Sequence, residues 1–195
     1  MEKKENQRIM LTKRLLRESL LQLMEEKDTQ NITVMELCHT AGINRSTFYN
    51  HYGCPMDVLL DIENGVVADL EVLWQREGSG KNWPLNKRIE ALCTYVYENR
   101  KLFKLLLRST DTNSGFASLV MNASHVQMTY EQVFSYAKSE DNKRLMTTFL
   151  SNGAYHMIRQ WLLEEIPKTP KEMGDLIYLV ATQGWERPLA ETQEK

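Results

Sequence analysis

Residues 44–51, NRSTFYNH, bring together several side chains that could bind a polyanion. If a helix begins after Asn44, then Phe48 and Tyr52 lie one turn apart on its core face. Arg pairs with guanine through two hydrogen bonds, Asn does the same with adenine, and hydroxyl groups bond to base edges or phosphates. This segment is therefore a candidate reader of the DNA major groove. The side chains that point outward in this arrangement are Arg45, Ser46, Thr47, Tyr49 and Asn50.

A competing interpretation needs no partner for these residues. Any surface helix shows a polar face to solvent, so composition alone favours a simple solvated face here. The order of the residues before and after the segment decides between the two interpretations.

Residues 32–52, ITVMELCHTAGINRSTFYNHY, contain two short segments with unusually complete start and stop signals. Thr33 and Glu36 have the spacing of a capping box, Gly42 suits a helix end, and Asn44 suits the start of the next helix. Helices of about two turns are unstable alone, so caps and packing must specify both of them. The sequence thus predicts a helix-turn-helix.

The same stretch resembles the DNA-binding signature of the TetR/AcrR family of bacterial transcriptional regulators. That signature runs Ile-Thr, an apolar pair, Ala-Gly-Val or Ile, a polar pair, Phe or Leu, Tyr, any residue, His, and Phe or Tyr. The resemblance covers about residues 8–60, and its Tyr-x-His-aromatic ending makes it more specific than a general helix-turn-helix. It implies an all-α fold of about nine helices. An N-terminal three-helix DNA-binding domain, residues 1–53, would join a helical effector-binding and dimerisation domain, residues 54–195.

The resemblance also assigns roles to single residues. Thr33 would present its helix N-terminus to a phosphate, which the unpaired N–H groups and the helix dipole favour. Tyr49 and His51 match phosphate contacts of the family. The family usually has a Lys at the start of the fourth helix, where this chain has Pro55, so one phosphate contact is missing. The residues expected to reach bases or the nearby backbone are Asn44, Arg45, Ser46, Thr47 and Asn50.

Charge in the N-terminal region is balanced, since residues 1–60 hold eight Lys or Arg and eight Asp or Glu. Each neutralised phosphate adds to DNA affinity, so we expect modest affinity for the monomer and dependence on dimer formation. The candidates to compensate are Lys13, Arg14, Arg17 and a disordered arm that carries Lys3 and Lys4.

Apolar residues at helical spacing extend over most of the chain. The sequence GSGKNWP at residues 78–84 is the clearest linker. No strand run, repeat or low-complexity tract is evident. Besides the helix-turn-helix, the expected helices span residues 8–26 and 55–76, two helices over 85–109, and then 116–137, 142–164 and 170–183.

Residues 149–180 resemble the C-terminal region of one branch of the family. The resemblance implies that two helices from each subunit form a four-helix dimer interface, although core packing explains any one of the apolar residues equally well. A two-fold axis would place the recognition helices about 34 Å apart, so the operator should be a near-palindrome. The candidate interface residues are Phe149, Leu150, Gly153, Met157, Trp161, Leu176, Ile177 and Val180.

In family members the middle helices enclose a small effector that shifts the DNA-binding heads apart. Apolar and aromatic walls with a few polar groups suit such ligands, but aromatic residues at helical spacing are more often core. The candidate wall residues here are Trp74, Tyr95, Tyr97, Phe103, Met121, His125, Met128 and Tyr130, and the effector itself is unidentified.

Other classes of protein find little support. Catalytic motifs such as G-x-S-x-G, H-E-x-x-H and a phosphate-binding glycine loop are absent, so we expect no enzyme. The three cysteines form no C-x-x-C pair, so neither a disulfide framework nor a thiolate zinc site is indicated, and no cofactor is expected. No signal peptide or membrane span is evident, which favours a cytoplasmic protein.

The resemblance therefore implies a DNA-binding transcriptional regulator. Most relatives repress, so the default expectation is a repressor that binds its operator as a homodimer and is released by a small-molecule effector. The alternative is an effector- or protein-binding module of the same fold that has lost specific operator binding. The lack of net charge in residues 1–60 and the Pro55 in place of Lys would allow this.

Overall fold

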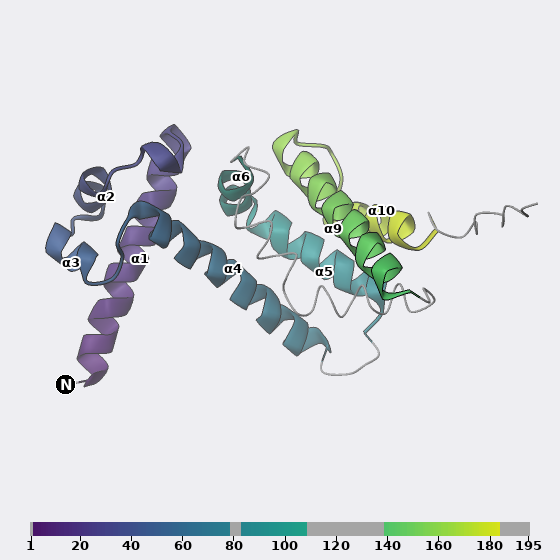
Figure 1. Ribbon diagram of the computed structural model, residues 1–195, viewed down its shortest axis with the longest axis horizontal. Coiled ribbons are helices and arrows are strands. Elements are labelled where there is room, and N and C mark those ends of the chain that lie inside the picture. Colours follow the sequence, from purple (N-terminus) through teal and green to yellow (C-terminus); the bar gives the residue numbers. More distant parts are fainter. Residues whose placement is uncertain (1, 79–82, 109–138, 184–195) are drawn as a thin grey trace, which may run out of the picture.

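The computed structural model describes residues 2–78, 83–108 and 139–183, and these fold into eight α-helices without any strand (Figure 1). A 3-10 helix, η1, spans Thr29–Asn31. The architecture confirms the all-α prediction. The helices are α1 (Glu2–Glu26), α2 (Val34–Ala41), α3 (Arg45–Tyr49), α4 (Pro55–Gly78), α5 (Leu85–Glu98), α6 (Arg100–Arg108), α9 (Glu140–Leu163) and α10 (Pro170–Gln183).

The first three helices share a small apolar core. Leu16 and Leu20 of α1, Leu37 of α2 and Phe48 of α3 are all fully buried and belong to one cluster. Burying a Leu or Phe side chain contributes roughly 1.5–3 kcal/mol, which two such short helices could not obtain alone. The core therefore fixes the angle between α2 and α3, which lie together on one side of α1 (Figure 1).

Helix α4 connects this N-terminal unit to the rest of the molecule. It packs on α1, and the buried residues Val58, Ile62, Val66 and Leu70 follow one another at intervals of four. That spacing keeps one apolar stripe on the inner side of the helix along most of its length. Figure 1 shows α4 running from α1 toward α5.

Helices α5, α6, α9 and α10 form the C-terminal bundle. Helices α5 and α10 pack closely, and a Cβ added to Gly174 would lie 3.0 Å from the Cα atom of Glu90. Helix α6 packs on α9, and Arg159 Nε donates a hydrogen bond to the carbonyl oxygen of Leu107 at 3.1 Å. A side chain at Gly174 would therefore push against the backbone of α5 and require the two helices to shift.

The observed boundaries agree with the predictions except at the N-terminus. The first helix was expected from Arg8 but begins at Glu2, so the prediction of a disordered arm for Lys3 and Lys4 is wrong. The run EKKENQ has no apolar periodicity, yet Glu, Lys and Gln are good helix formers and extend α1. The helix expected at 116–137 lies outside the described residues. None of the described helices is long and apolar enough to cross a membrane.

Candidate nucleic-acid interface

The N-terminus of α2 carries the predicted capping box. Thr33 Oγ1 accepts a hydrogen bond from the Glu36 N–H at 3.2 Å, and the Thr33 N–H donates to Glu36 Oε2 at 2.9 Å. Lys27 Nζ binds the other carboxylate oxygen at 2.5 Å. The hydrogen bond from Lys27 and those from Thr33 lower the pKa of Glu36 from 4.5 to about 2. The carboxylate is therefore charged and held at the start of the helix.

This geometry limits what Thr33 itself can offer to a phosphate. Its N–H group and its hydroxyl are both bonded to Glu36, the hydroxyl donating at 2.8 Å. The following N–H groups of a helix's first turn have no partner four residues earlier. The N–H groups of Val34 and Met35 are therefore the better donors to an anion at this end of α2.

The turn between α2 and α3 has the predicted geometry. Gly42 adopts a left-handed conformation, with φ 65° and ψ 31°, and the Ile43 N–H donates to the carbonyl oxygen of Cys38 at 2.9 Å. Asn44 occupies the N-cap position of α3, but its side chain makes no capping hydrogen bond. Its amide is exposed and so remains available to a partner.

Helix α3 presents polar side chains around one buried aromatic ring. Phe48 has no exposed surface, whereas Tyr49 next to it is 59% exposed and its ring packs edge-on against Phe48 at 5.4 Å. The outward set predicted from the sequence lies largely at the surface. Asn44, Arg45, Ser46, Tyr49 and Asn50 are exposed, whereas Thr47 and His51 are half-buried.

Tyr52 closes the helix-turn-helix and connects it to α4. It is buried, as predicted, and its hydroxyl donates to Asp61 Oδ2 at 2.5 Å. Arg17 of α1 binds the same oxygen through Nε at 2.8 Å and Nη2 at 2.7 Å. Lys13 Nζ lies 5.4 Å from the centre of the Tyr52 ring. One carboxylate of α4 therefore holds both α1 and the end of the recognition segment.

The charge of this cluster is set by competing effects on Asp61. Burial alone would raise the pKa of its carboxyl, but hydrogen bonds from Tyr52 and Arg17 outweigh burial and lower it. Burial and the Asp61 carboxylate together raise the pKa of the Tyr52 hydroxyl well above its ordinary value. Asp61 is therefore an anion that accepts from both neighbours near neutral pH.

Pro55 is the first residue of α4 and is buried, so it cannot replace the phosphate-binding Lys of the family. The N–H groups of Gly53 and Cys54 at this helix end both donate to Asp57 Oδ2, at 2.7 Å and 3.1 Å. These two bonds lower the pKa of the Asp57 carboxyl. An acidic side chain therefore occupies the anion-binding positions at the start of α4.

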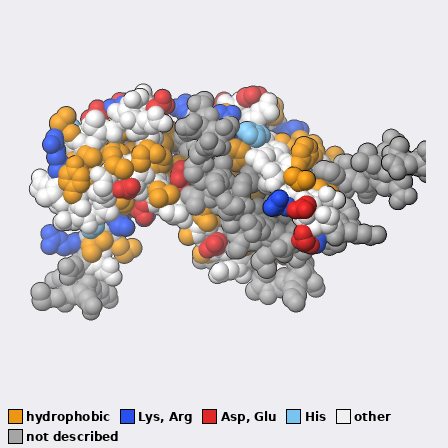
Figure 2. All heavy atoms as spheres, viewed as in Figure 1, with side chains coloured by type: hydrophobic (Ala, Val, Ile, Leu, Met, Phe, Trp, Pro, Cys, Tyr) orange, Lys and Arg blue, Asp and Glu red, His pale blue; other side chains and the backbone are white. Residues whose placement is uncertain are grey.

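Cations of the N-terminal unit lie mainly on α1 and at the start of α3. Figure 2 shows Lys and Arg side chains at the end of the molecule that α1 and α3 form. Arg8, Arg14 and Arg45 are exposed, while Lys13 and Arg17 are half-buried. Of the three basic residues proposed to compensate for Pro55, Arg17 is bound to Asp61, so Lys13 and Arg14 are the more available.

Four residues of the predicted effector wall, Trp74, Tyr95, Tyr97 and Phe103, lie within the described residues, where each takes part in an aromatic pair, and the cavity that they were expected to line stays a prediction. Trp74 packs edge-on against Trp83 at 6.0 Å, and Tyr95 packs against Phe103 at 5.9 Å. The Tyr97 ring stacks on the Trp161 ring, with their centres 5.4 Å apart. The remaining predicted wall residues, Met121, His125, Met128 and Tyr130, lie outside the described part of the chain.

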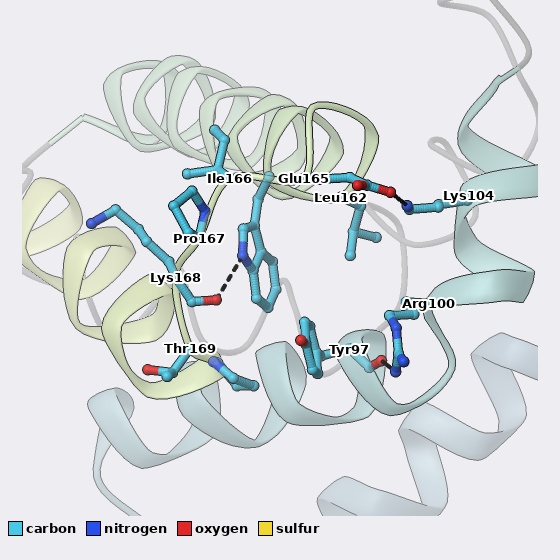
Figure 3. Close-up of a pocket in the computed structure, with 11 residues that line it drawn as sticks. Tyr97, Arg100, Lys104, Leu162, Glu165, Ile166, Pro167, Lys168 and Thr169 are labelled. Atoms are coloured by element: carbon cyan, nitrogen blue, oxygen red, sulfur yellow. Dashed lines mark hydrogen bonds and ion pairs between the residues drawn. The ribbon is translucent and has the colours of Figure 1, made fainter.

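A pocket of about 510 Å³ lies between α5, α6, α9 and the loop before α10 (Figure 3). Tyr97 is the one predicted wall residue that lines it. Its other walls include Arg100, Lys104, Trp161 and Lys168, of which none but Trp161 was singled out from the sequence. Their proximity depends on the packing of α6 against α9, which no local pattern predicts.

The predicted dimer residues fall into three groups by burial. Leu150, Trp161 and Ile177 are at most 5% exposed, because they pack inside the single chain, so they cannot offer surface to a second copy. Met157 and Leu176 are half-buried. Gly153 is exposed, and a Cβ there would meet no atom within 4 Å. The large apolar side chains that are exposed on α9 and α10 are Leu145, Phe149, Tyr178, Leu179 and Val180.

The arrangement defines a class of protein, namely a helix-turn-helix protein with a helical C-terminal bundle. Comparison with known proteins identifies the family. A model described as "Transcriptional regulator C-terminal region" of the TetR type matches residues 84–183, which are 100 of the chain's 195 residues. The chain therefore belongs to the TetR family of transcriptional regulators. Membership of this non-enzymatic family also confirms the prediction that the chain is not an enzyme.

A curated relative agrees with this assignment. The chain is 21% identical over 181 residues to the uncharacterized HTH-type transcriptional regulator YxbF of Bacillus subtilis, covering 86% of this chain but 44% of that protein. The chain thus spans less than half the length of this curated relative.

Two solved structures share the fold of this chain. A TetR transcriptional regulator from Streptococcus agalactiae superposes with a TM-score of 0.71 at 18% identity, covering 93% of this chain and 99% of that one. The TetR-family repressor FadR of Thermus thermophilus, solved with lauroyl-CoA, superposes with a TM-score of 0.62 at 16% identity, covering 94% and 100%.

Proposed function

We propose that this TetR-family regulator represses transcription by binding a near-palindromic operator as a homodimer and leaves the DNA when a small effector binds. The observation that carries the proposal is the surface of α3, where Arg45, Ser46, Tyr49 and Asn50 are exposed around the buried Phe48. These side chains can donate to and accept from base edges and phosphates.

Each exposed residue has a specific role in this proposal. Arg45 and Asn50 read bases, because each of them can form two hydrogen bonds with one base edge. Asn44, Ser46 and Thr47 contact bases or the adjoining backbone, and Tyr49 and His51 bind phosphates. At α2, Thr33 fixes the first turn through Glu36 so that the N–H groups of the helix end face a phosphate.

The homodimer rests on the apolar residues left exposed by the C-terminal helices. Leu145 and Phe149 of α9 are 64% and 66% exposed, and Leu179 and Val180 of α10 are 44% and 42% exposed. Exposed apolar side chains on adjoining helices are typical of a helix-pair interface, and Gly153 would permit close approach there. A two-fold axis between these pairs carries the two α3 helices into successive major grooves.

The division of the chain follows from this proposal. Residues 1–53 would act as the DNA-binding domain and residues 54–195 as the effector-binding and dimerisation domain. Asp61 lies beyond that boundary yet binds Arg17 and Tyr52, so the first turns of α4 would move with the DNA-binding domain. Effector-driven displacement of α4 would then reposition α3.

The experiment is an electrophoretic shift assay with the intergenic DNA upstream of the protein's own gene. We expect specific retardation that survives excess unrelated DNA and is lost in Arg45→Ala and Tyr49→Phe. Gln22→Ala, an exposed change on α1, is the matched control and should bind normally. Equal, weak retardation of every DNA at low salt would instead favour a module of this fold without operator specificity.

The direction of regulation needs a separate readout. A transcriptional reporter driven by the retarded fragment should rise when the gene is deleted and fall when it is restored. A reporter that falls on deletion would identify an activator.

A further inference from the structure

The pocket between α6 and the α9–α10 loop carries an excess of positive charge. Arg100 and Lys104 come from α6, against the single carboxylate of Glu165, whereas the side chain of Lys168 is directed away from them on the other side of Trp161 (Figure 3). Among the described residues, no ion pair engages Arg100. The pocket thus has charge to offer to an anion that enters it.

An aromatic floor lies beside these cations. The rings of Tyr97 and Trp161 stack nearly parallel, at 18° and 5.4 Å, and Trp161 Nε1 donates to the carbonyl oxygen of Lys168 at 3.0 Å. This hydrogen bond fixes the indole, and the Tyr97 ring that stacks on the indole is held in place with it. The Arg100 guanidinium lies 5.1 Å from the centre of the Tyr97 ring, which brings a cation next to an apolar surface. Tyr97 itself is 40% exposed and can contact a ligand.

Glu165 closes one side of the pocket. It adopts φ 53° just after α9, where Ile166 N–H donates back to the Trp161 carbonyl oxygen at 3.1 Å. Glycine is the usual residue at this helix end, because the left-handed conformation costs other residues about 1–2 kcal/mol. Here the position places a carboxylate 2.6 Å from Lys104 Nζ.

The ion pair between Glu165 and Lys104 can be exchanged. The Glu165 side chain is 77% exposed, and exposed pairs of this kind contribute little to stability. An incoming anion that meets Arg100 as well as Lys104 would replace one carboxylate contact with two. Glu165 thus occupies, in the free protein, a position that a ligand's anionic group would take.

We propose that this pocket binds a small organic anion with a flat apolar body, its charged group held by Arg100 and Lys104 and its apolar body packed on Tyr97. A volume of about 510 Å³ accommodates a molecule of this kind. Of the residues predicted to line an effector wall, Tyr97 lines this pocket, whereas Trp74, Tyr95 and Phe103 do not.

Isothermal titration of the full chain tests the site without DNA, so failure here leaves the operator proposal untouched. The probe is phenyl phosphate, with phenol and inorganic phosphate as partial probes that carry only one of its two features. We expect saturable binding of phenyl phosphate that is at least about tenfold tighter than binding of either partial probe. Absence of saturable binding, or equal binding of inorganic phosphate, would overturn the proposal.

Two variants of the same ion pair should change the affinity in opposite directions. Lys104→Gln removes a cation and should weaken binding of phenyl phosphate about five- to tenfold, whereas Glu165→Gln removes the competing carboxylate and should strengthen it severalfold. Both variants lose the ion pair between Lys104 and Glu165. If that pair only held the pocket in shape, both changes would weaken binding, and that result would contradict the proposal. Lys101→Gln, an exposed change on α6 outside the pocket, is the control and should leave the affinity unchanged.

Discussion

Arg17 of α1 and Asp61 of α4, 44 residues apart in the chain, are joined by two contacts to one carboxylate oxygen, at 2.8 Å and 2.7 Å. The Tyr52 hydroxyl donates to the same oxygen. The end of the helix-turn-helix is therefore fastened to α4 by a shared anion and not by apolar packing alone.

Asp61→Asn should destabilise the protein by about 1–2 kcal/mol, because the neutral amide accepts more weakly from Arg17 and Tyr52. Urea unfolding at pH 7 measures this free energy. Arg14→Gln is the control, since Arg14 meets Glu18 in an exposed pair at 3.7 Å and should contribute little.

The same cluster predicts a pH dependence. The folded-state pKa of Asp61 lies below the ordinary value of 3.8, so its contribution is present above the unfolded pKa and is lost as pH falls through the folded pKa. The free energy of unfolding should therefore fall more steeply below about pH 4 in the wild type than in Asp61→Asn. Parallel curves for the two proteins would mean that Asp61 is not charged in this contact.

The capping box of α2 gives a second stability prediction. Thr33→Ala removes the acceptor for the Glu36 N–H and should cost about 1 kcal/mol in urea unfolding. Glu36→Gln can keep the box but loses its charge. Since the folded pKa of Glu36 is about 2 and its ordinary value is 4.5, the wild type should lose more stability than Glu36→Gln as pH falls from 4.5 toward 2.

Two helical glycines, Gly174 of α10 and Gly65 of α4, should respond in opposite directions to replacement by alanine. Gly174→Ala would place a methyl group 3.0 Å from the Glu90 Cα atom and should destabilise the protein by about 1–3 kcal/mol. Gly65→Ala on α4 meets no atom within 4 Å and should stabilise it by about 0.5–1 kcal/mol. Thermal unfolding of both variants compares them, and a stable Gly174→Ala would mean that α10 lies farther from α5.

The proposed dimer predicts that charge on its surface separates the subunits. Leu145→Glu and Phe149→Glu should each raise the dimer dissociation constant by at least about tenfold, because a carboxylate would be buried without a partner. Sedimentation equilibrium measures this constant. Leu60→Glu makes the same change at an exposed position on α4 and should leave it unaltered. Three identical constants would place the interface elsewhere.

Local signals in the sequence predicted the helix-turn-helix well. The Thr33–Glu36 box, the left-handed Gly42 and the burial of Phe48 and Tyr52 depend on residues at most four positions apart, and all are present. Asn44 was predicted as a cap and occupies the cap position, but its side chain is not used. The short-range patterns therefore predicted the course of the backbone more completely than they predicted the hydrogen bonds of the side chains.

Contacts between distant helices were beyond the reach of these patterns. Arg17 was read as a possible phosphate ligand, but it binds Asp61. Trp161 and Ile177 were assigned to a dimer surface, yet both are buried in the single chain. An apolar residue at helical spacing marks an inward face without saying which neighbour covers it, and only the assembled bundle decides.

Selection of bound sequences from random DNA by the purified wild-type protein tests the central claim most directly. We predict a near-palindrome whose half-sites are about 34 Å apart, with Arg45→Ala losing the preference at the base that Arg45 reads while keeping the half-site spacing. Recovery of no common sequence at physiological ionic strength, or of a motif that Arg45→Ala selects unchanged, would contradict a role for α3 in reading DNA.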